Sequence, residues 1–199
     1  MAAVYSSGAE DLLTDRFAAF HVSGGTTEML SVSPSDTGFH VQILGGSADL
    51  HAGQAIDRVG VMMGLRFPCG KEMEALAKQN QKSVPTPRIS VKDGACHFSG
   101  LENLAQRLWK ESGDPALVSA FVLEYTAKTL KKMTEWLDRC DRGIPIVYGG
   151  GVMSNQYLQS VLSKRANTYF AEPSFSADNA AGIALLCRRQ MQRTIGGVK

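Results

Sequence analysis

Alternating apolar and polar positions near the start of the chain predict three consecutive strands. They cover residues 17–22, 28–33 and 39–44. Ser23-Gly24-Gly25-Thr26 joins the first two, and a Ser-Pro-Ser-Asp-Thr-Gly segment joins the second and third. Both compositions are typical of turns. The strands are therefore expected to form a meander, whereas the first eight residues show no pattern that begins a helix or a strand.

Helical spacing of apolar residues dominates the middle of the chain. Over residues 52–64 apolar side chains recur three and four positions apart, and Gly64 followed by Pro68 ends that helix. Ser99 is expected to cap a later helix, with Glu102 at the capping-box position. The helices expected in this region cover residues 52–64, 70–79, 99–109 and 114–141, with a proline-containing loop over 82–87.

The last third of the chain alternates strand and helix. We expect a strand over 144–148, a helix over 154–165, a short strand over 168–170 and a final helix over 178–193. A meander, then helices, then alternating elements indicate an α/β fold with a mixed sheet and flanking helices. No internal repeat, low-complexity tract or linker divides the 199 residues, so a single domain is expected.

The composition is that of an ordinary soluble protein. Hydrophobic residues make up 44% and charged residues 20% of the chain. The net charge of +2 is too small to indicate a nucleic-acid partner, and no apolar run is long enough to cross a membrane. The four cysteines lie too far apart to form a zinc-type pair. Because the sequence shows no secretory pattern, we expect reduced cysteines and a cytoplasmic location.

Two glycine turns are the first candidates for a binding site. Gly149-Gly150-Gly151 follows the apolar strand over 144–148, and Gly24-Gly25 follows the strand over 17–22. Glycine lets a phosphate or a base come close to backbone amides, above all where a helix begins. Either turn alone is as often a plain turn. Two such turns on strand ends, far apart in sequence, suggest a nucleotide held from two sides.

Six segments carry a resemblance to a known family. They are Val22–Glu28, Asp49–Val59, Gly64–Gly70, Phe98–Leu101, Gly150–Asn155 and Ser176–Ala181. In this order they resemble the motifs Val-Ser-Gly-Gly-His-Thr-Glu, Asp-Asp-Ala-Ala-Gly-Glu-Ala-Phe-Asp-Lys-Val, Gly-Leu-Pro-Tyr-Pro-Gly-Gly, Phe-Ser-Gly-Leu, Gly-Gly-Val-Ala-Ala-Asn and Cys-Thr-Asp-Asn-Gly-Ala. These motifs belong to the TsaD-type tRNA threonylcarbamoyltransferases, long labelled O-sialoglycoprotein endopeptidases or glycoproteases. The segments span nearly the whole chain, so the resemblance is specific.

The resemblance implies an actin-like fold of the sugar-kinase, ribonuclease H-like class, in which two lobes close on a nucleotide. It implies ATP or threonylcarbamoyl-adenylate as ligand, an iron or zinc ion in the cleft, and transfer of the threonylcarbamoyl group to adenosine in tRNA. The nucleotide- and substrate-binding residues that it implies are His21, Val22, Ser23, Gly24, Gly25, Asp57, Gly70, Gly150, Gly151 and Asn155. The metal ligand that it implies is Asp178.

The chain also departs from the family pattern. Thr26 stands where the family has histidine, and Cys69 replaces the first glycine of its Pro-Gly-Gly motif. The family's His-x-x-x-His metal pair lies before the point that matches Met1. We therefore expect residues 1–199 to be a single actin-like C-terminal lobe with a helical insertion at about 70–141, without the N-terminal metal-binding lobe.

Several residues admit a plainer interpretation. Asp57 shares a helix face with Gly53, which suits a ribose approaching over glycine, but it is also placed to pair with Arg58 or Lys71. Asn155 suits an adenine or ribose edge, and it is equally a helix cap.

Other polar residues also have two interpretations. The Ser23 hydroxyl and its neighbouring amides are interpreted as phosphate contacts, because no nucleophile motif surrounds that residue. Asp178 is alternatively a helix cap. His51 and His97 are interpreted as ordinary polar histidines rather than replacement metal ligands.

The favoured function is the nucleotide-binding half of a TsaD-like transferase. The alternatives are a non-catalytic actin-like partner subunit of that complex, and, least favoured, a metalloendopeptidase, for which no zinc-protease helix is present. The partners expected are tRNA and a paralogous actin-like subunit, with no membrane. The isolated chain is expected to be inactive, to bind adenine nucleotides weakly or not at all, and to form a homodimer through apolar residues exposed around Val4, Tyr5 and Phe17.

Overall fold

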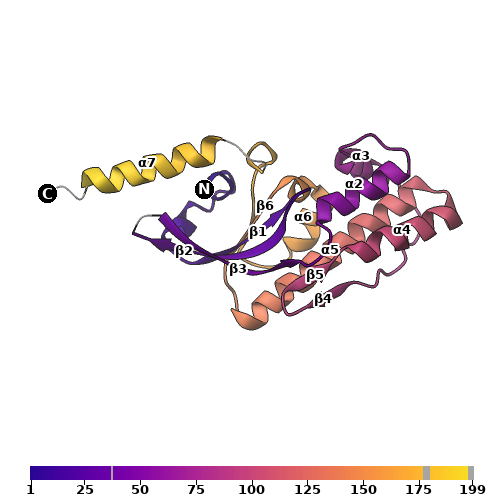
Figure 1. Ribbon diagram of the computed structural model, residues 1–199, viewed down its shortest axis with the longest axis horizontal. Coiled ribbons are helices and arrows are strands. Elements are labelled where there is room, and N and C mark those ends of the chain that lie inside the picture. The colour runs from indigo at the N-terminus through magenta and orange to yellow at the C-terminus, as the bar shows by residue number, and fades with distance from the viewer. Residues whose placement is uncertain (37, 177–179, 197–199) are drawn as a thin grey trace.

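The computed structural model of the chain describes residues 1–36, 38–176 and 180–196. It is a curled, mixed seven-stranded sheet with most of its helices gathered at one end (Figure 1). The strand order is β4-β5-β3-β2-β1-β6-β7. An α/β fold with a mixed sheet and flanking helices is therefore confirmed.

The predicted strands form the centre of the sheet. The meander is antiparallel, and β6 and β7 then continue parallel to β1. These strands are β1 (Phe17–Val22), β2 (Thr27–Ser35), β3 (Gly38–Ser47), β6 (Ile146–Gly149) and β7 (Thr168–Phe170). All five lie where the apolar pattern predicts them.

Two strands were not predicted. β4 (Ser90–Lys92) and β5 (Ala95–His97) form a hairpin that adds to the edge of the sheet beyond β3. Each has only three residues and, unlike the equally short strand over 168–170, has no cluster of large apolar side chains that would predict a strand. The hairpin is held from outside, because Gly94 packs on the Trp136 ring and its carbonyl accepts a hydrogen bond from the Gly46 amide. The segment expected as a helical insertion is therefore not entirely helical.

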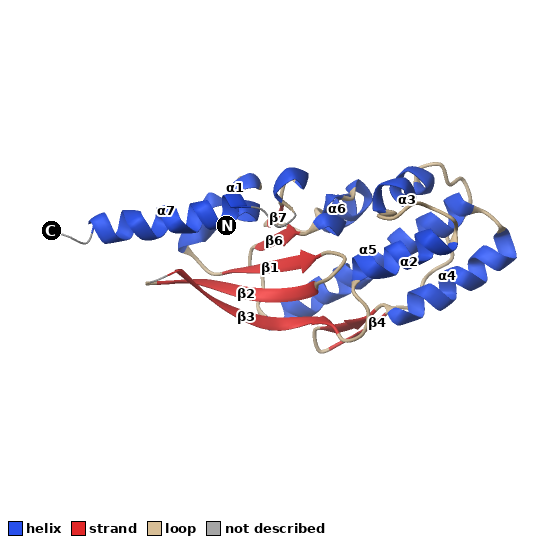
Figure 2. Ribbon diagram, turned by 45° about the horizontal axis from the view of Figure 1, so that its top comes forward, coloured by secondary structure: helices blue, strands red, loops and turns tan. Residues whose placement is uncertain are grey.

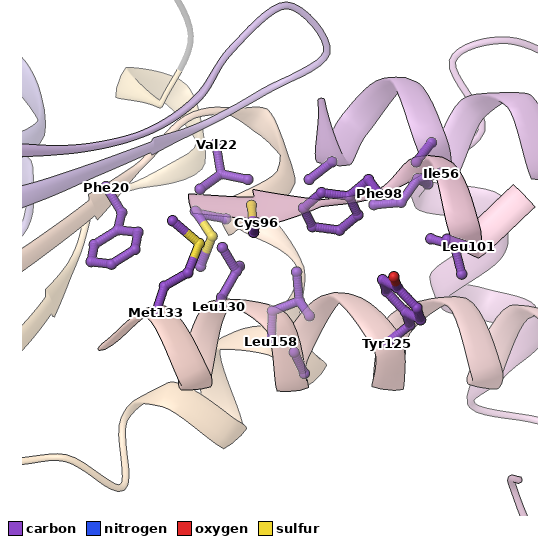
Figure 3. Packing of buried hydrophobic residues seen from close by; sticks show 14 of the residues in the cluster. Phe20, Val22, Ile56, Cys96, Phe98, Leu101, Tyr125, Leu130, Met133 and Leu158 are labelled. Atoms are coloured by element: carbon purple, nitrogen blue, oxygen red, sulfur yellow. The ribbon is translucent and has the colours of Figure 1, made fainter. Parts of the chain in front are cut away.

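The main helices lie together, and the longest of them runs along one face of the sheet while most of the others gather beyond its end (Figure 2). They are α2 (Ala52–Met62), α3 (Gly70–Ala77), α4 (Ser99–Ser112), α5 (Pro115–Cys140) and α6 (Gln156–Leu162). The predicted start of α5 is confirmed, since the Asp114 carboxylate accepts hydrogen bonds from the Ala116 and Leu117 amides at 3.0 and 3.2 Å. The side chains of this face form the larger core (Figure 3). There Phe20 and Val22 of β1 lie over Leu130 and Met133 of α5.

The capping box expected at Ser99 is wrong. Ser99 is the first residue of α4, Phe98 precedes the helix, and no side-chain cap from within the segment is formed. The Asp49 carboxylate instead accepts hydrogen bonds from the Phe98 and Ser99 amides at 2.8 and 3.1 Å. Glu102 forms an ion pair with Arg58 on α2. The helix is therefore capped by a residue about fifty positions upstream, and a pattern of neighbouring residues cannot predict such a cap.

The opposite face of the sheet carries a smaller core. It is covered by α1 (Ala2–Ser6), a 3-10 helix η1 (Glu10–Thr14) and part of α7 (Ala180–Gly196), which runs beside the chain's N-terminus (Figure 1). A helix at residues 2–6 contradicts the expectation that the start of the chain has no regular structure. Val4 and Phe17 are 3% and 4% exposed, so the expectation that they form an uncovered surface is also wrong.

Candidate functional site

The strand order brings the two glycine turns to one edge of the sheet. β1 runs parallel to β6 with His21 opposite Gly149, and β6 runs parallel to β7. The carboxyl ends of these three strands therefore point the same way, and the turns that follow them are neighbours. This is the edge at which open α/β sheets place ligands.

Gly150 is required by the packing of the two turns. Its φ is +97°, which residues other than glycine rarely adopt. A Cβ at this position would lie 2.3 Å from the Val22 carbonyl oxygen. The Val22 side chain is fully buried in the larger core. The Gly150 position is thus explained by the approach of the β1 backbone, with no ligand needed.

The turn after β1 docks onto the start of α2. The Ser23 amide donates to the Thr26 carbonyl at 2.7 Å, which closes the turn. The Ser23 carbonyl then accepts from the Gly53 amide at 3.1 Å, and the Thr27 hydroxyl accepts from the Ala52 amide at 2.9 Å. Two of the amides that a helix start leaves unpaired are thus satisfied from the strand side.

This docking corrects the interpretation of Gly53. A Cβ at Gly53 would lie 2.7 Å from both the Ser23 carbonyl oxygen and the Gly24 nitrogen. The space over Gly53 is therefore filled by the turn itself and holds no room for a ribose. The Gly25 amide is also engaged, since it donates to the Ser23 hydroxyl oxygen at 3.3 Å.

A depression of about 750 Å³ opens beside this turn. Residues that line it include Gly24, Gly25, His51, Asp57, Arg58 and Phe67. Phe67 is 70% exposed, so an apolar ring stands at the margin of the depression. Glycine backbone, a helix start, a carboxylate and an aromatic ring are together suited to a phosphorylated ligand with a flat ring system.

Asp57 is held in place by the chain that leads into α3. Its Oδ1 accepts a hydrogen bond from the Cys69 amide at 2.8 Å. Arg58 forms its ion pair with Glu102 at 3.2 Å rather than with Asp57. The Cys69 side chain is buried against Gly60, and burial raises the pKa of its thiol. Cys69 therefore acts as a packing residue that fixes Asp57, and a reactive thiol is not favoured.

Four of the predicted binding glycines share a property. Gly24, Gly25, Gly70 and Gly151 have no heavy atom within 4 Å of the position that a Cβ would take, and none has a positive φ. Among the glycines of the described chain up to Gly182, no other combines both properties. Packing and backbone strain therefore give no reason for glycine at these positions.

Asn155 has a structural role in the fold. It is 9% exposed and precedes α6, where its Oδ1 accepts a hydrogen bond from the Leu158 amide at 3.1 Å. The short 3-10 helix η2 (Gly151–Ser154), which leads to it, contacts both β1 and α2. Asn155 thus lies close to the glycine edge while it caps its own helix.

Other predicted residues lie elsewhere. His21 lines a separate cavity of about 410 Å³ on the opposite face of the sheet, together with Gly149 and Ser176. His97 belongs to β5 and lies near Ser90. The predicted metal ligand Asp178 falls outside the described residues. Among the residues that are described, no three His, Cys, Asp or Glu side chains gather as a metal site would require, so these residues alone do not form an iron or zinc site.

The comparisons with solved structures define the class of protein. The chain is similar to full-length HypF in its phosphate- and nucleotide-bound form, with a TM-score of 0.72 over 94% of this chain and 42% of that one, at 13% identity. It is also similar to the activator of 2-hydroxyisocaproyl-CoA dehydratase from Clostridium difficile with bound ADPNP, with a TM-score of 0.50 over 94% and 68% of the two chains. The fold is therefore actin-like.

The family follows from the sequence matches. The family model for tRNA N6-adenosine threonylcarbamoyltransferase, TsaD, matches residues 5–185, and the chain belongs to this family. The enzyme of that name from Chlorobium phaeovibrioides is 29% identical over 96% of this chain and 61% of its own length. The one from Dichelobacter nodosus is 32% identical over 84% and 52%. The chain thus spans between half and about three fifths of the length of these relatives.

In the part of the chain that the structure covers, every helix is too short or too polar to span a bilayer.

Proposed function

We propose that this chain is the nucleotide-binding half of a TsaD-type transferase. In this proposal residues 1–199 form one actin-like lobe that holds ATP or threonylcarbamoyl-adenylate. The complete enzyme passes the threonylcarbamoyl group from the adenylate to adenosine of tRNA. Membership of the family supports the reaction class, and the depression beside the β1 turn supports the position of the nucleotide.

The observation that carries the proposal is the open space over four glycines. Any small residue would fit at Gly24, Gly25, Gly70 and Gly151 without strain or clash. Glycine at such positions is explained if a ligand lies against the backbone, because a Cβ would then hold it away. All four positions are among those that the family motifs assign to nucleotide and substrate.

The residues around the depression suggest how a nucleotide would lie. Its phosphates would lie against Gly24 and Gly25 near the start of α2, where the helix dipole favours an anion. The Asp57 Oδ2 would accept a hydrogen bond from a ribose hydroxyl, while Oδ1 stays with the Cys69 amide. This lobe would contribute orientation to the reaction, since acyl transfer is accelerated when the carbonyl is fixed in line with the attacking amine.

The nucleotide site can be tested on the chain itself. Because the chain is shorter than its relatives, we expect weak binding, which amide shift changes in an NMR titration with millimolar ATP would detect. The shifts should concentrate at Gly24, Gly25 and the start of α2. Gly24→Ala should abolish them and leave the unfolding midpoint unchanged. Gly182→Ala is the matched control, since Gly182 lies in α7 and a Cβ there would meet only Ala2, at ordinary contact distance.

Two outcomes would oppose the proposal. Shifts confined to the opposite face, around Phe39 and Val41, would place the ligand in the other cavity. Unchanged binding by Gly24→Ala would remove the argument from open glycines.

A non-catalytic partner subunit is the second candidate, favoured by Thr26 at the position of the family's histidine. The complete gene product, supplied with threonylcarbamoyl-adenylate and tRNA, would then bind nucleotide without modifying the tRNA.

A further inference from the structure

His51 occupies the capping position of α2 but does not cap the helix. Its backbone is extended, with φ −76° and ψ 148°, and its side chain makes no capping hydrogen bond. Short polar side chains are strongly preferred at this position. Here the amides of Ala52 and Gly53 are already satisfied by Thr27 and Ser23 from the β1 turn. The His51 imidazole is therefore not needed to cap the helix.

The two ring nitrogens of His51 have different surroundings. Nδ1 is buried and has no hydrogen-bond partner. A buried N–H without an acceptor is costlier and rarer than a buried acceptor without a donor. The neutral ring is therefore expected to leave Nδ1 unprotonated and to carry its proton on Nε2. His51 also lines the depression beside Gly24 and Gly25.

We propose that His51 is a further ligand-binding residue of this depression, whose Nε2–H donates a hydrogen bond to a phosphate oxygen of the bound nucleotide. The proposal rests on the nucleotide site proposed above and adds a residue that the family motifs do not assign. It also explains why a large ring stands at a helix start that small residues usually occupy.

The charges around the depression are consistent with this position. Arg58 is paired with Glu102, so its charge is largely neutralised within the protein. Asp57 would repel a phosphate, but it lies six residues along α2 from His51, which is about 9 Å of helix rise. A phosphate near His51 would therefore meet an N–H donor and the positive end of the helix dipole, away from the Asp57 carboxylate.

Paired substitutions separate the donor from the ring. The glutamine amide nitrogen lies close to where Nε2 lies, whereas the asparagine amide nitrogen reaches only the position of Nδ1. His51→Gln should therefore keep ATP binding within about twofold, and His51→Asn and His51→Ala should each weaken it about tenfold, as expected for loss of a hydrogen bond to a charged group. His97→Ala is the matched control, because that histidine lies on β5 and outside the depression.

The measurement is an NMR titration of the chain with ATP and, separately, with inorganic pyrophosphate, together with the ¹⁵N shifts of the His51 ring. We expect the Nε2–H tautomer of the ring in the free protein and a shift of Nε2 with either probe. Equal binding by wild type, His51→Asn and His51→Ala, or the Nδ1–H tautomer, would overturn the inference. If ATP leaves the Gly24 and Gly25 amides of the wild type unshifted, the nucleotide site itself fails. If those amides shift and the His51 variants bind normally, only the role of His51 fails.

Discussion

The glycine turn after β1 and the glycine turn after β6 have similar sequences, but they are built differently. The β1 turn is held by a segment distant in sequence. The Thr27 hydroxyl and the Ser23 carbonyl accept hydrogen bonds from the first amides of α2, which lies about twenty-five residues further along the chain. The β6 turn is continued by local structure, since Asn155 caps the helix that immediately follows. The β1 turn leaves both Gly24 and Gly25 open, whereas in the β6 turn Gly151 is open but Gly150 is pressed against Val22.

This difference separates two reasons for glycine that look identical in a sequence. Gly150 and Gly53 are glycines because protein backbone occupies the space where a side chain would lie. Gly24 and Gly25 have no such neighbour, so packing gives no reason for glycine there, and the nucleotide site proposed above would supply one. Substitutions in and around the two turns test which glycines are required by packing and which are not.

The largest effect is expected at Gly150. Gly150→Ala places a methyl group against the Val22 carbonyl and forces a positive φ on alanine, so the free energy of unfolding should fall by about 3 kcal/mol or more. Urea unfolding followed by circular dichroism measures the change. Gly151→Ala, one residue further and open on all sides, should change stability by less than about 0.5 kcal/mol. Equal midpoints for the two variants would erase the distinction between packed and open glycines.

Gly53→Ala should be the next most damaging. Alanine gains up to about 1 kcal/mol of helix propensity over glycine, but the new methyl would clash with the turn at Ser23 and Gly24. We expect a net loss of about 1–2 kcal/mol. Gly100→Ala in α4 is the control, since its Cβ would meet only the Tyr125 hydroxyl at 3.9 Å, and it should be neutral or stabilising. A stabilised Gly53→Ala would show that the turn does not dock on α2 as described.

Low pH should weaken a second long-range helix cap, in which the Asp49 carboxylate accepts hydrogen bonds from amides at the start of α4. Burial alone would raise the pKa of Asp49, but hydrogen bonds from Ser99 and from backbone amides outweigh it and hold the pKa well below its usual range. Asp49 therefore stabilises the fold above about pH 3.9, the value in the unfolded chain, and this contribution is lost as the pH falls toward the lowered pKa.

Asp49→Asn should cost about 1 kcal/mol at pH 7, a modest value because the carboxylate is largely exposed. Denaturant unfolding at a series of pH values should show the difference between wild type and variant narrowing progressively as the pH falls below about 3.9. A difference that stays constant well below that pH would exclude this role for the charge.

An effect on stability no larger than that of Asp49→Asn is expected at Asn155, where two substitutions separate capping from binding. Asn155→Ala removes the cap of α6 and should cost about 1 kcal/mol. Asn155→Asp keeps an accepting oxygen for the Leu158 amide and should retain most of that stability, while it removes the Nδ2 donor. Weaker ATP binding in Asn155→Asp at unchanged stability would add Asn155, which follows the β6 turn, to the residues that bind nucleotide. Unchanged binding would confine Asn155 to its structural role.

Much of the architecture could be predicted locally. The strands at 17–22 and 168–170 agree with the structure because each alternates or clusters apolar residues over its own length. The start of α5 was also predictable, because Asp114 and Pro115 act on amides two and three residues away. The β4–β5 hairpin and the 2–6 helix were missed, because such short elements are stabilised by what they pack against rather than by their own pattern.

The order of the longer elements, the family and the set of glycines and acids that mark the candidate site can all be derived from the sequence. What each of them does depends on the folded structure: Gly53 and Gly150 accommodate backbone, Gly24 and Gly25 face open space, and the Asp49 carboxylate rather than the Ser99 side chain caps α4. Tertiary structure also decided that His21 lies on the other face of the sheet and that His51 lies beside the turn. The physical reason is the range of the interactions. Periodicity and capping act within a few residues, whereas close backbone approach and shared hydrogen bonds join segments that only the folded sheet brings together.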